Sequence, residues 1–432
     1  MFIFRKLKLF MISVAVLSLL CSTTGCDKEK GSKSAKSTKD SGITITILSG
    51  LWSKPSETEF VVTQVLNPFA KKLGINISFQ ITSSSLAAME RIEVQKVARQ
   101  VSSNLEIASS GQLSNWINDD YVVDLTDHIK DWKDLKFLPA FSKGIKRDGK
   151  TYFIPICGNV YLLFANKQAL KYLPKGCTID TLTWDDFADW AINIKKGTGY
   201  GRTVVTGVPL QSWIYQFGCT ELSYGAEFPT VDSPGARKAW NVWARIAKAD
   251  AFIPNVREIA DCSIPMIRGE AWLTILNNTK VGETFETNET RYVIGKMPSG
   301  TKGRGAIVGF SGIGLIKGAP NQDYALKVLK QFTNPEIQVK LARGTGGFVP
   351  AEEAALKFLD ANDPQDIVIR KAMHEMKGNV VISGVPAYKF KDWGAVKMVF
   401  DVLFQKILLK KEFLTDKDYA KAVKQLNNLR KK

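Results

Sequence analysis

The residues that could carry catalysis are sparse in this 432-residue chain. Only two histidines occur, so a Ser-His-Asp hydrolase or a multi-histidine metal site would have to be built on His128 or His374. The segment around His128 is typical of a surface helix or turn, and His374 lies on a predicted helix, so both are predicted to be surface side chains. The sequence has no GxSxG elbow, no P-loop and no HExxH motif. It therefore predicts no catalytic residue, no metal site and no cofactor.

Cysteine and glycine patterns give equally weak signals for metal, redox or phosphate chemistry. Export would permit disulfides, but Cys157, Cys177, Cys219 and Cys262 are scattered and form no CxxC pair, so buried free thiols are favoured. The glycines of 344–347 suggest a phosphate cradle, yet a helix that ends and turns into a strand explains them as well.

Aromatic side chains are the abundant chemical resource, with ten tryptophans, eleven tyrosines and 23 phenylalanines. Trp190, Trp240 and Trp243 fall in helical phase and are predicted to be core. Trp52 and Trp213 stand in loop-like contexts, where an indole is suited to stacking on the apolar face of a ligand. Sugar rings expose such faces beside their hydroxyls. We therefore expect Trp52 and Trp213 to contact a ligand, with a core position as the alternative.

Alternating and helical segments indicate the elements that would position these side chains. Residues 43–48 alternate like a half-buried strand, 56–73 is helical, and 75–81 alternates again. Strand, helix and strand in this order predict a βαβ unit with a parallel sheet. A helix within 84–103 and a strand over 105–108 extend it.

Helix signals dominate beyond a turn at 147–150. Capping-box patterns at 183–186 and 415–418 predict two helix starts. A further helix is predicted over 392–411, and strand patterns return near 306–316. The fold class is therefore α/β.

The N-terminus carries an export signal. Basic residues precede an apolar run over 9–20 that is too short to span a bilayer, as in a signal peptide. The residues Thr23-Thr24-Gly25-Cys26 resemble a bacterial lipoprotein processing box, which implies a signal peptide over 1–25 and lipidation of Cys26. The alternative is plain signal-peptidase cleavage with Cys26 as an incidental thiol. Residues 26–42, rich in lysine and serine, are predicted to be a flexible tether.

The leader implies a location outside the cytoplasm. The expected protein is exported and anchored through its lipid to the outer face of the cytoplasmic membrane, in the periplasm or at the cell surface. Nucleic acid is not an expected partner for such a protein.

The chain is basic, with a formal net charge of +17. Residues 389–432 hold twelve lysines and arginines against five acidic residues, so much of this charge lies in the last helices. This distribution argues against a strongly anionic ligand. A solvated surface is favoured over a face for anionic lipid or a partner.

Four stretches resemble motifs of bacterial extracellular solute-binding proteins of ABC importers, in the family that includes maltose-binding protein. They are Asp148–Pro155 with Phe164–Leu170, Thr183–Phe187, Gly269–Trp272, and Ser311–Gly318 followed by Thr333–Gln338. Their order and spacing extend the resemblance from residue 43 almost to the C-terminus. It implies the two-lobe periplasmic-binding-protein fold of type II, with solute held in a cleft between lobes joined by crossing segments.

The resemblance also implies domain bounds and partners. One lobe would comprise 43–153 plus 308–378, and the other 154–307 plus 379–432. The protein would be a monomer that captures a small solute, a sugar or oligosaccharide, and delivers it to the permease subunits of an ABC transporter.

Family members contact solute from loops that follow strands and from helix starts, which the resemblance transfers to twelve positions here. They are Trp52, Ser53, Ser84, Ser110, Gln112, Asn159, Tyr161, Trp213, Asn277, Gly309, Ser311 and Tyr388. Asn159 stands where many members have aspartate, a departure that affects hydroxyl recognition.

Other functions stay open at this point. The protein could be a sensor that presents solute to a membrane receptor, or a lipid-anchored enzyme, which the scarcity of histidine disfavours. The solute itself could be a polyol, a sugar phosphate, a peptide or another small molecule.

Overall fold

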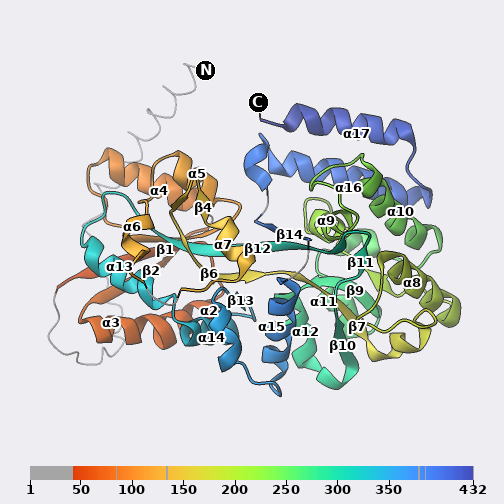
Figure 1. Cartoon of the computed structure of the whole chain (residues 1–432), viewed down its shortest axis with the longest axis horizontal. Helices are drawn as coiled ribbons and strands as arrows, with labels where there is room; N and C mark the ends of the chain where they lie inside the picture. The colour runs from red at the N-terminus through yellow and green to blue at the C-terminus, as the bar shows by residue number, and fades with distance from the viewer. Residues whose placement is uncertain (1–41, 84, 133–134, 378–379, 385, 432) are drawn as a thin grey trace, which may run out of the picture.

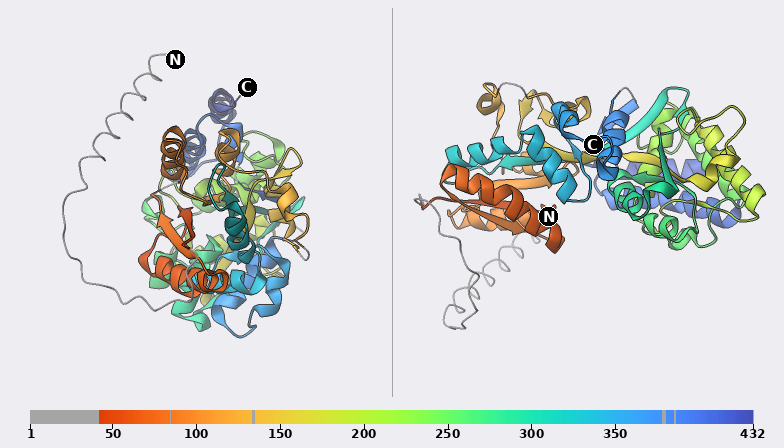
Figure 2. Two further views of the ribbon diagram at one scale, coloured as in Figure 1. Left: turned by 90° about the vertical axis from the view of Figure 1, so that its left-hand side faces the viewer. Right: turned by 90° about the horizontal axis from the view of Figure 1, so that it is seen from below.

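The computed structural model describes residues 42–431, apart from 84, 133–134, 378–379 and 385. They form two α/β lobes that lie side by side and are joined by long strands through the middle of the molecule (Figures 1 and 2). Each lobe has a sheet of its own. The expected two-lobe α/β fold is therefore confirmed. In the part of the chain that the structure describes, no helix is both long and apolar enough to cross a bilayer.

The first lobe is built on a sheet with the strand order β13-β6-β12-β3-β1-β2. The strands are β1 (Thr44–Ser49), β2 (Asn76–Ile81), β3 (Leu105–Ser109), β6 (Ile154–Asn159), β12 (Gly303–Leu315) and β13 (Val349–Pro350). β1 pairs in parallel with β2 and with β3, which confirms the predicted βαβ unit. Because parallel neighbours end at the same edge, the loops that follow β1 and β3 lie together there.

Helices pack on both faces of this sheet, and the alternation in β1 shows why. Ile45 and Ile47 are buried against one layer that includes Val65, while Leu48 is buried against the other with Ile92. The elements are α2 (Pro55–Phe60), the π-helical η1 (Val61–Leu66), α3 (Asn67–Leu73), α4 (Ser85–Val97), α5 (Leu113–Asn118), α6 (Thr126–Ile129), α7 (Pro139–Gly144), α13 (Gln322–Gln331), α14 (Pro335–Gly344) and η5 (Glu353–Phe358). The predicted turn at 147–150 joins the short strands β4 (Lys146–Arg147) and β5 (Lys150–Thr151).

The second lobe contains a four-stranded sheet with the order β10-β7-β9-β8. The strands are β7 (Tyr161–Asn166), β8 (Thr203–Val204), β9 (Leu273–Asn277) and β10 (Tyr292–Gly295). Around it lie η2 (Lys167–Tyr172), α8 (Trp184–Thr198), α9 (Trp213–Ser223), α10 (Pro234–Lys248), η3 (Val256–Glu258), α11 (Ser263–Arg268), α12 (Asn278–Thr287), η4 (Glu289–Arg291), α15 (Pro364–Glu375), α16 (Trp393–Lys410) and α17 (Asp416–Leu429). Smaller elements are β11 (Ser299–Gly300), β14 (Val380–Ser383) and η6 (Pro386–Lys389).

Aromatic packing makes the core of the second lobe. Trp190, Trp240 and Trp243 are buried, as their helical phase predicts. Both predicted capping boxes form: the hydroxyls of Thr183 and Thr415 each accept a hydrogen bond from the backbone N–H three residues on, at the starts of α8 and α17. Local sequence therefore fixes where these helices begin.

The long strand β12 connects the two lobes. Its second half, from Gly309, pairs with β6 and β3 in the first sheet, while residues 305–308 pair with β14 and lie against α9. A Cβ on Gly305 would meet the Cys219 carbonyl oxygen at 2.1 Å, so glycine permits this close approach. β12 thus runs through the middle of the molecule from one lobe to the other (Figure 1).

One of the expected domain bounds differs in the structure. Residues 154–159 form β6, which pairs with β12 and β13 in the first sheet, so the first crossing follows Asn159 and not residue 153. Residues 364–375 form α15, which packs against α12 and β7 of the second lobe and also against β13 of the first sheet, so this helix contacts both lobes. Long-range strand pairing decides which lobe β6 joins, and the local sequence pattern does not reveal that pairing.

Candidate functional site

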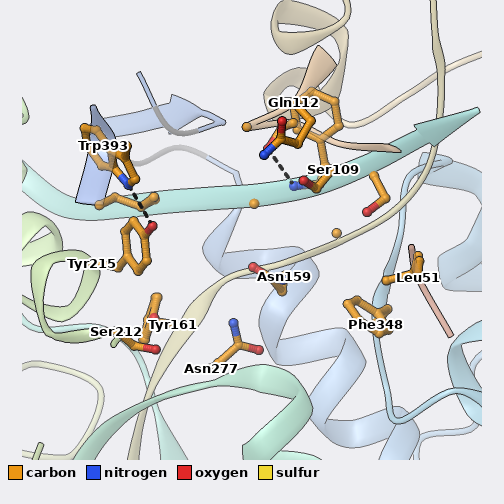
Figure 3. A pocket seen from close by; sticks show the side chains of 17 residues that line it. Leu51, Ser109, Gln112, Asn159, Tyr161, Ser212, Tyr215, Asn277, Phe348 and Trp393 are labelled. Atoms are coloured by element: carbon orange, nitrogen blue, oxygen red, sulfur yellow. Dashed lines mark hydrogen bonds between the residues drawn. The ribbon is translucent and has the colours of Figure 1, made fainter. Parts of the chain in front are cut away.

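A pocket of about 540 Å³ lies where the two lobes meet, beside the crossing strands β6 and β12 (Figure 3). Both lobes and the crossing strands contribute to its wall. It is lined by Leu51, Ser109, Ser110, Gly111, Gln112, Gly158, Asn159, Tyr161, Ser212, Tyr215, Asn277, Ile307, Gly309, Phe310, Ser311, Phe348 and Trp393. The volume falls within the range of small-molecule sites.

The first lobe contributes hydroxyl and amide groups from the end of β3. Ser110 follows this strand, where its backbone N–H donates to the Phe310 carbonyl oxygen at 2.7 Å. Gln112 immediately precedes α5, and its backbone N–H donates to the Ser109 carbonyl oxygen at 2.8 Å. These backbone bonds hold the segment against β12, so its polar side chains face the pocket (Figure 3).

The crossing strands place an amide at the centre of the pocket. Asn159 is the last residue of β6 and pairs with Gly309 of β12. A Cβ on Gly309 would meet Asn159 Oδ1 at 2.6 Å, so a larger residue there would displace this side chain. Glycine at 309 therefore makes room for the Asn159 amide.

The second lobe adds an aromatic wall beside further polar groups. The indole Nε1 of Trp393, at the start of α16, donates to the Tyr215 hydroxyl at 3.0 Å. Tyr161 starts β7 and is 7% exposed, and burial raises its pKa, although a hydrogen bond with Ser212 acts in the opposite direction. Burial raises the pKa of Tyr215 as well. Both phenols are therefore neutral at physiological pH and able to donate hydrogen bonds.

None of the 17 described residues that line the pocket has a charged side chain, in a chain of net charge +17. An ionic solute would lose its hydration there without a counter-charge, which costs several kcal/mol. Hydroxyls, amides and aromatic faces instead match a neutral solute that carries both polar groups and apolar patches. The arrangement is suited to binding and contains no nucleophile paired with a base.

Seven of the twelve expected solute contacts lie at this pocket. They are Ser110, Gln112, Asn159, Tyr161, Asn277, Gly309 and Ser311. Their direct contact with solute remains a prediction. All seven lie at a strand end, at a helix start or on β12, as the resemblance to the family implied.

Trp213 is a correction, because it lies in the core and not at the pocket. It is the first residue of α9 and is fully buried. Its ring stacks on Phe404 of α16 at a centroid distance of 3.6 Å and contacts Trp243 edge-on at 4.9 Å. The loop-like sequence before it conceals a helix start whose indole turns inward.

Trp52 is a second correction, because it too is buried away from the pocket. It is 2% exposed, its ring lies 6.4 Å from that of Phe79, and it is absent from the pocket lining. Ser53 is exposed and likewise does not line the pocket. The neighbouring Leu51 takes the expected place, since the chain turns at Trp52 with a positive φ of 60°.

Two of the twelve expected solute contacts cannot be placed at the pocket. Ser84 lies outside the described residues, and Tyr388 lies in η6 with its side chain outside the described part. The predicted lipidation site, Cys26, also lies outside the described residues. The pocket is also lined by residues that were not predicted there, among them Leu51, Ser109, Ser212, Tyr215, Phe348 and Trp393. Ser212 and Tyr215 lie within two residues of Trp213. The prediction therefore selected the right segment of the chain but the residue on its buried face.

The histidines and cysteines behave largely as predicted. His128 and His374 are both exposed. Cys157, Cys219 and Cys262 are buried free thiols, whereas Cys177 is free but only partly buried. Within the described ranges, no three His, Cys, Asp or Glu side chains gather in a way that could hold a metal ion.

Asn277 has two separable roles that a pair of substitutions can distinguish. Its Oδ1 caps α12 by accepting from Thr279 N–H at 3.1 Å, which leaves Nδ2 to face the pocket (Figure 3). We expect Asn277→Asp to keep the cap but lose a donor, so solute affinity should fall about tenfold at nearly unchanged stability. Asn277→Ala should also lose about 1 kcal/mol of unfolding free energy. Calorimetric titration and denaturant unfolding of both variants test this, and equal stability losses would refute the separation.

Comparison with known proteins places the chain in a family. The family model described as bacterial extracellular solute-binding protein matches residues 64–367. A chain of Brucella abortus (strain 2308), named as a candidate binding protein, is 23% identical over 310 residues, or 67% of this chain and 72% of that one.

Solved structures share the fold at low sequence identity. The sugar-binding protein MalE from Xanthomonas citri aligns with a TM-score of 0.73 at 16% identity, covering 89% of this chain and 96% of that one. The cyclic alpha-maltosyl-1,6-maltose binding protein from Arthrobacter globiformis aligns with a TM-score of 0.70 at 15% identity, covering 90% and 98%. The family model, which matches most of the described residues, and the two-lobe fold lead to one conclusion: the chain belongs to the bacterial extracellular solute-binding proteins.

Proposed function

We propose that this protein captures a sugar or oligosaccharide in the cleft between its lobes and delivers it to the permease of an ABC importer. The observation that carries the proposal is the uncharged pocket, in which the Asn159 and Asn277 amides lie opposite the rings of Tyr215 and Trp393. Amides and hydroxyls bind sugar hydroxyls, while indole and phenol rings cover C–H faces.

The comparison proteins support the same class of solute. Structures that share this fold contain maltose, acarbose, alpha-D-tagatose, cycloalternan and ribitol. Sugar phosphates fit this pocket poorly, because none of its lining residues is a lysine or arginine that would pair with the phosphate. The role is binding without catalysis, since the family and the comparison proteins are binding proteins.

A thermal-shift panel tests the proposal. It comprises maltose, acarbose, tagatose, cycloalternan and ribitol, with glucose 6-phosphate and a tripeptide as charged comparisons. We expect at least one neutral sugar to raise the melting temperature in a concentration-dependent way, because solute binds only the folded state. Stabilisation by the charged compounds alone would contradict the proposal.

The same proposal includes a lipid anchor at Cys26, supported by Gly25-Cys26 after the apolar run. An acyl chain and a tether over 26–42 would keep the receptor close to its permease and raise its effective concentration there. We expect Cys26→Ser to abolish acylation and to move the protein out of the membrane fraction. Fractionation with metabolic labelling by a fatty acid measures this, with Cys177→Ser as the matched control. A Cys26→Ser protein that stays labelled and membrane-bound would refute the anchor.

A further inference from the structure

Four side chains on one face of α16 hold the segment that leads into the pocket. Trp393, Lys397, Asp401 and Gln405 are spaced four residues apart, which places them along one side of the helix. Each makes a hydrogen bond to the stretch from Gly207 to Tyr215. Only Trp393 lines the pocket itself, so the other three act on the solute site from outside it.

The bonds to this stretch concentrate on one residue, Leu210. Asp401 Oδ2 accepts from the Leu210 backbone N–H at 2.7 Å, and Lys397 Nζ donates to the Leu210 carbonyl oxygen at 3.1 Å. Gln405 Nε2 donates to the Gly207 carbonyl oxygen at 2.7 Å, while Gln405 Oε1 accepts from Arg257 Nε at 2.7 Å. Hydrogen bonds from α16 therefore hold both the N–H and the carbonyl group of Leu210, and also the carbonyl group of Gly207 three residues earlier.

Leu210 needs such support, because its backbone is left-handed with a φ of 64°. For a branched side chain this region is sterically unfavourable, and it persists only where the surroundings enforce it. The Leu210 side chain is 46% exposed, so packing of its own does not enforce the turn. Asp401, at 4% exposure, is the buried carboxylate that does, and burial raises its pKa.

The turn determines where the pocket side chains lie. Ser212 follows Leu210 by two residues and lines the pocket, and Tyr215 lies one helical turn further on, where its hydroxyl accepts from the Trp393 indole N–H. We propose that Lys397, Asp401 and Gln405 are positioning residues of the solute site, which hold the 207–212 segment so that Ser212 and Tyr215 face the cleft. This inference rests on the proposed function as a solute receptor, but its structural part can be measured without solute.

Hydrogen exchange tests the structural part. In Asp401→Ala the Leu210 amide loses its acceptor, so its exchange should quicken at least tenfold, while a core amide such as that of Trp240 exchanges as in the wild type. Asp401→Asn, which keeps an acceptor of the same shape, should restore most of the protection. Lys410→Ala, an exposed position at the end of the same helix, is the matched control and should change neither amide.

Affinity tests the positioning role. With the panel sugar that stabilises the wild type most, calorimetric titration should give a dissociation constant about tenfold higher for Asp401→Ala and nearly normal for Asp401→Asn. Leu210→Val disturbs the same turn while every residue of α16 is kept, because a β-branched residue disfavours a positive φ. This variant should also raise the dissociation constant. This variant keeps the inference testable if the alanine variant does not fold.

Two results would overturn the inference. One is unchanged exchange at Leu210 in Asp401→Ala; the other is quickened exchange with unchanged affinity, which would make the contacts merely structural. If no panel sugar binds the wild type, the proposed function fails on its own, and the exchange result still decides whether α16 holds this turn.

Discussion

Replacing Trp213 with alanine is expected to lower the free energy of unfolding by about 3–5 kcal/mol, the range for a large aromatic removed from a packed core. The side chain is fully buried, stacks on Phe404 at 3.6 Å and also contacts Phe217 and Trp243. Affinity in the fraction that stays folded should remain near the wild-type value, since Trp213 does not line the pocket. Denaturant unfolding and calorimetric titration measure the two quantities.

A conservative variant serves as the control for this prediction. Trp213→Phe keeps a ring against Phe404 and gives up only part of the buried surface, so it should lose much less stability than the alanine variant. The indole Nε1 has no hydrogen-bond partner among the described residues, so phenylalanine loses no bond there. A small loss of stability in Trp213→Ala together with a large loss of affinity would contradict this prediction and indicate that Trp213 contacts solute.

Replacing Trp393 with alanine is expected to reduce solute affinity strongly and stability only moderately, the reverse of Trp213→Ala. Its ring lines the pocket and is only partly buried, and buried tryptophans at recognition surfaces commonly contribute about 2 kcal/mol or more. That corresponds to a loss of affinity of roughly thirtyfold. The unfolding free energy should fall less than in Trp213→Ala, because Trp393 is only partly buried, with ring contacts to Phe228 and Phe390 at 6.3 and 5.7 Å.

A second substitution at 393 separates the two contributions of the indole. Trp393→Phe retains an aromatic face for the solute but removes the hydrogen bond to the Tyr215 hydroxyl. It should recover a large part of the affinity if stacking dominates. Titration of both variants with the best panel sugar measures this, and wild-type affinity in Trp393→Ala would exclude the aromatic wall from recognition.

The positions of Trp213 and Tyr215 illustrate what local sequence can and cannot predict. An α-helix turns by about 100° per residue, so Trp213 and Tyr215 point about 200° apart. Whichever of them faces Phe404 of α16, the other faces the cleft, and Phe404 lies far along the chain. The local sequence marks the segment, and packing between distant helices selects the face.

The lobe to which β6 belongs and the contacts of α16 could not be predicted from local sequence, for the same reason. Strand β6 belongs to the first sheet because it pairs with β12 and β13, whose residues come some 150–200 positions later. The Leu210 turn is held by Lys397 and Asp401, which again come from a remote helix. No local pattern encodes such pairings.

By itself the sequence determined the features that depend on neighbours along the chain. Strict alternation over 43–48 and 75–81 set the parallel unit, since side chains of a strand point alternately to its two faces. Capping residues set the helix starts at Thr183 and Thr415. The resemblance to the family implied that Ser110 and Gln112 belong to the site, and both line the pocket, at the edge where the parallel strands end. Only the tertiary structure decided which aromatic rings line the pocket, because burial of a ring depends on partners that the fold brings from elsewhere in the chain.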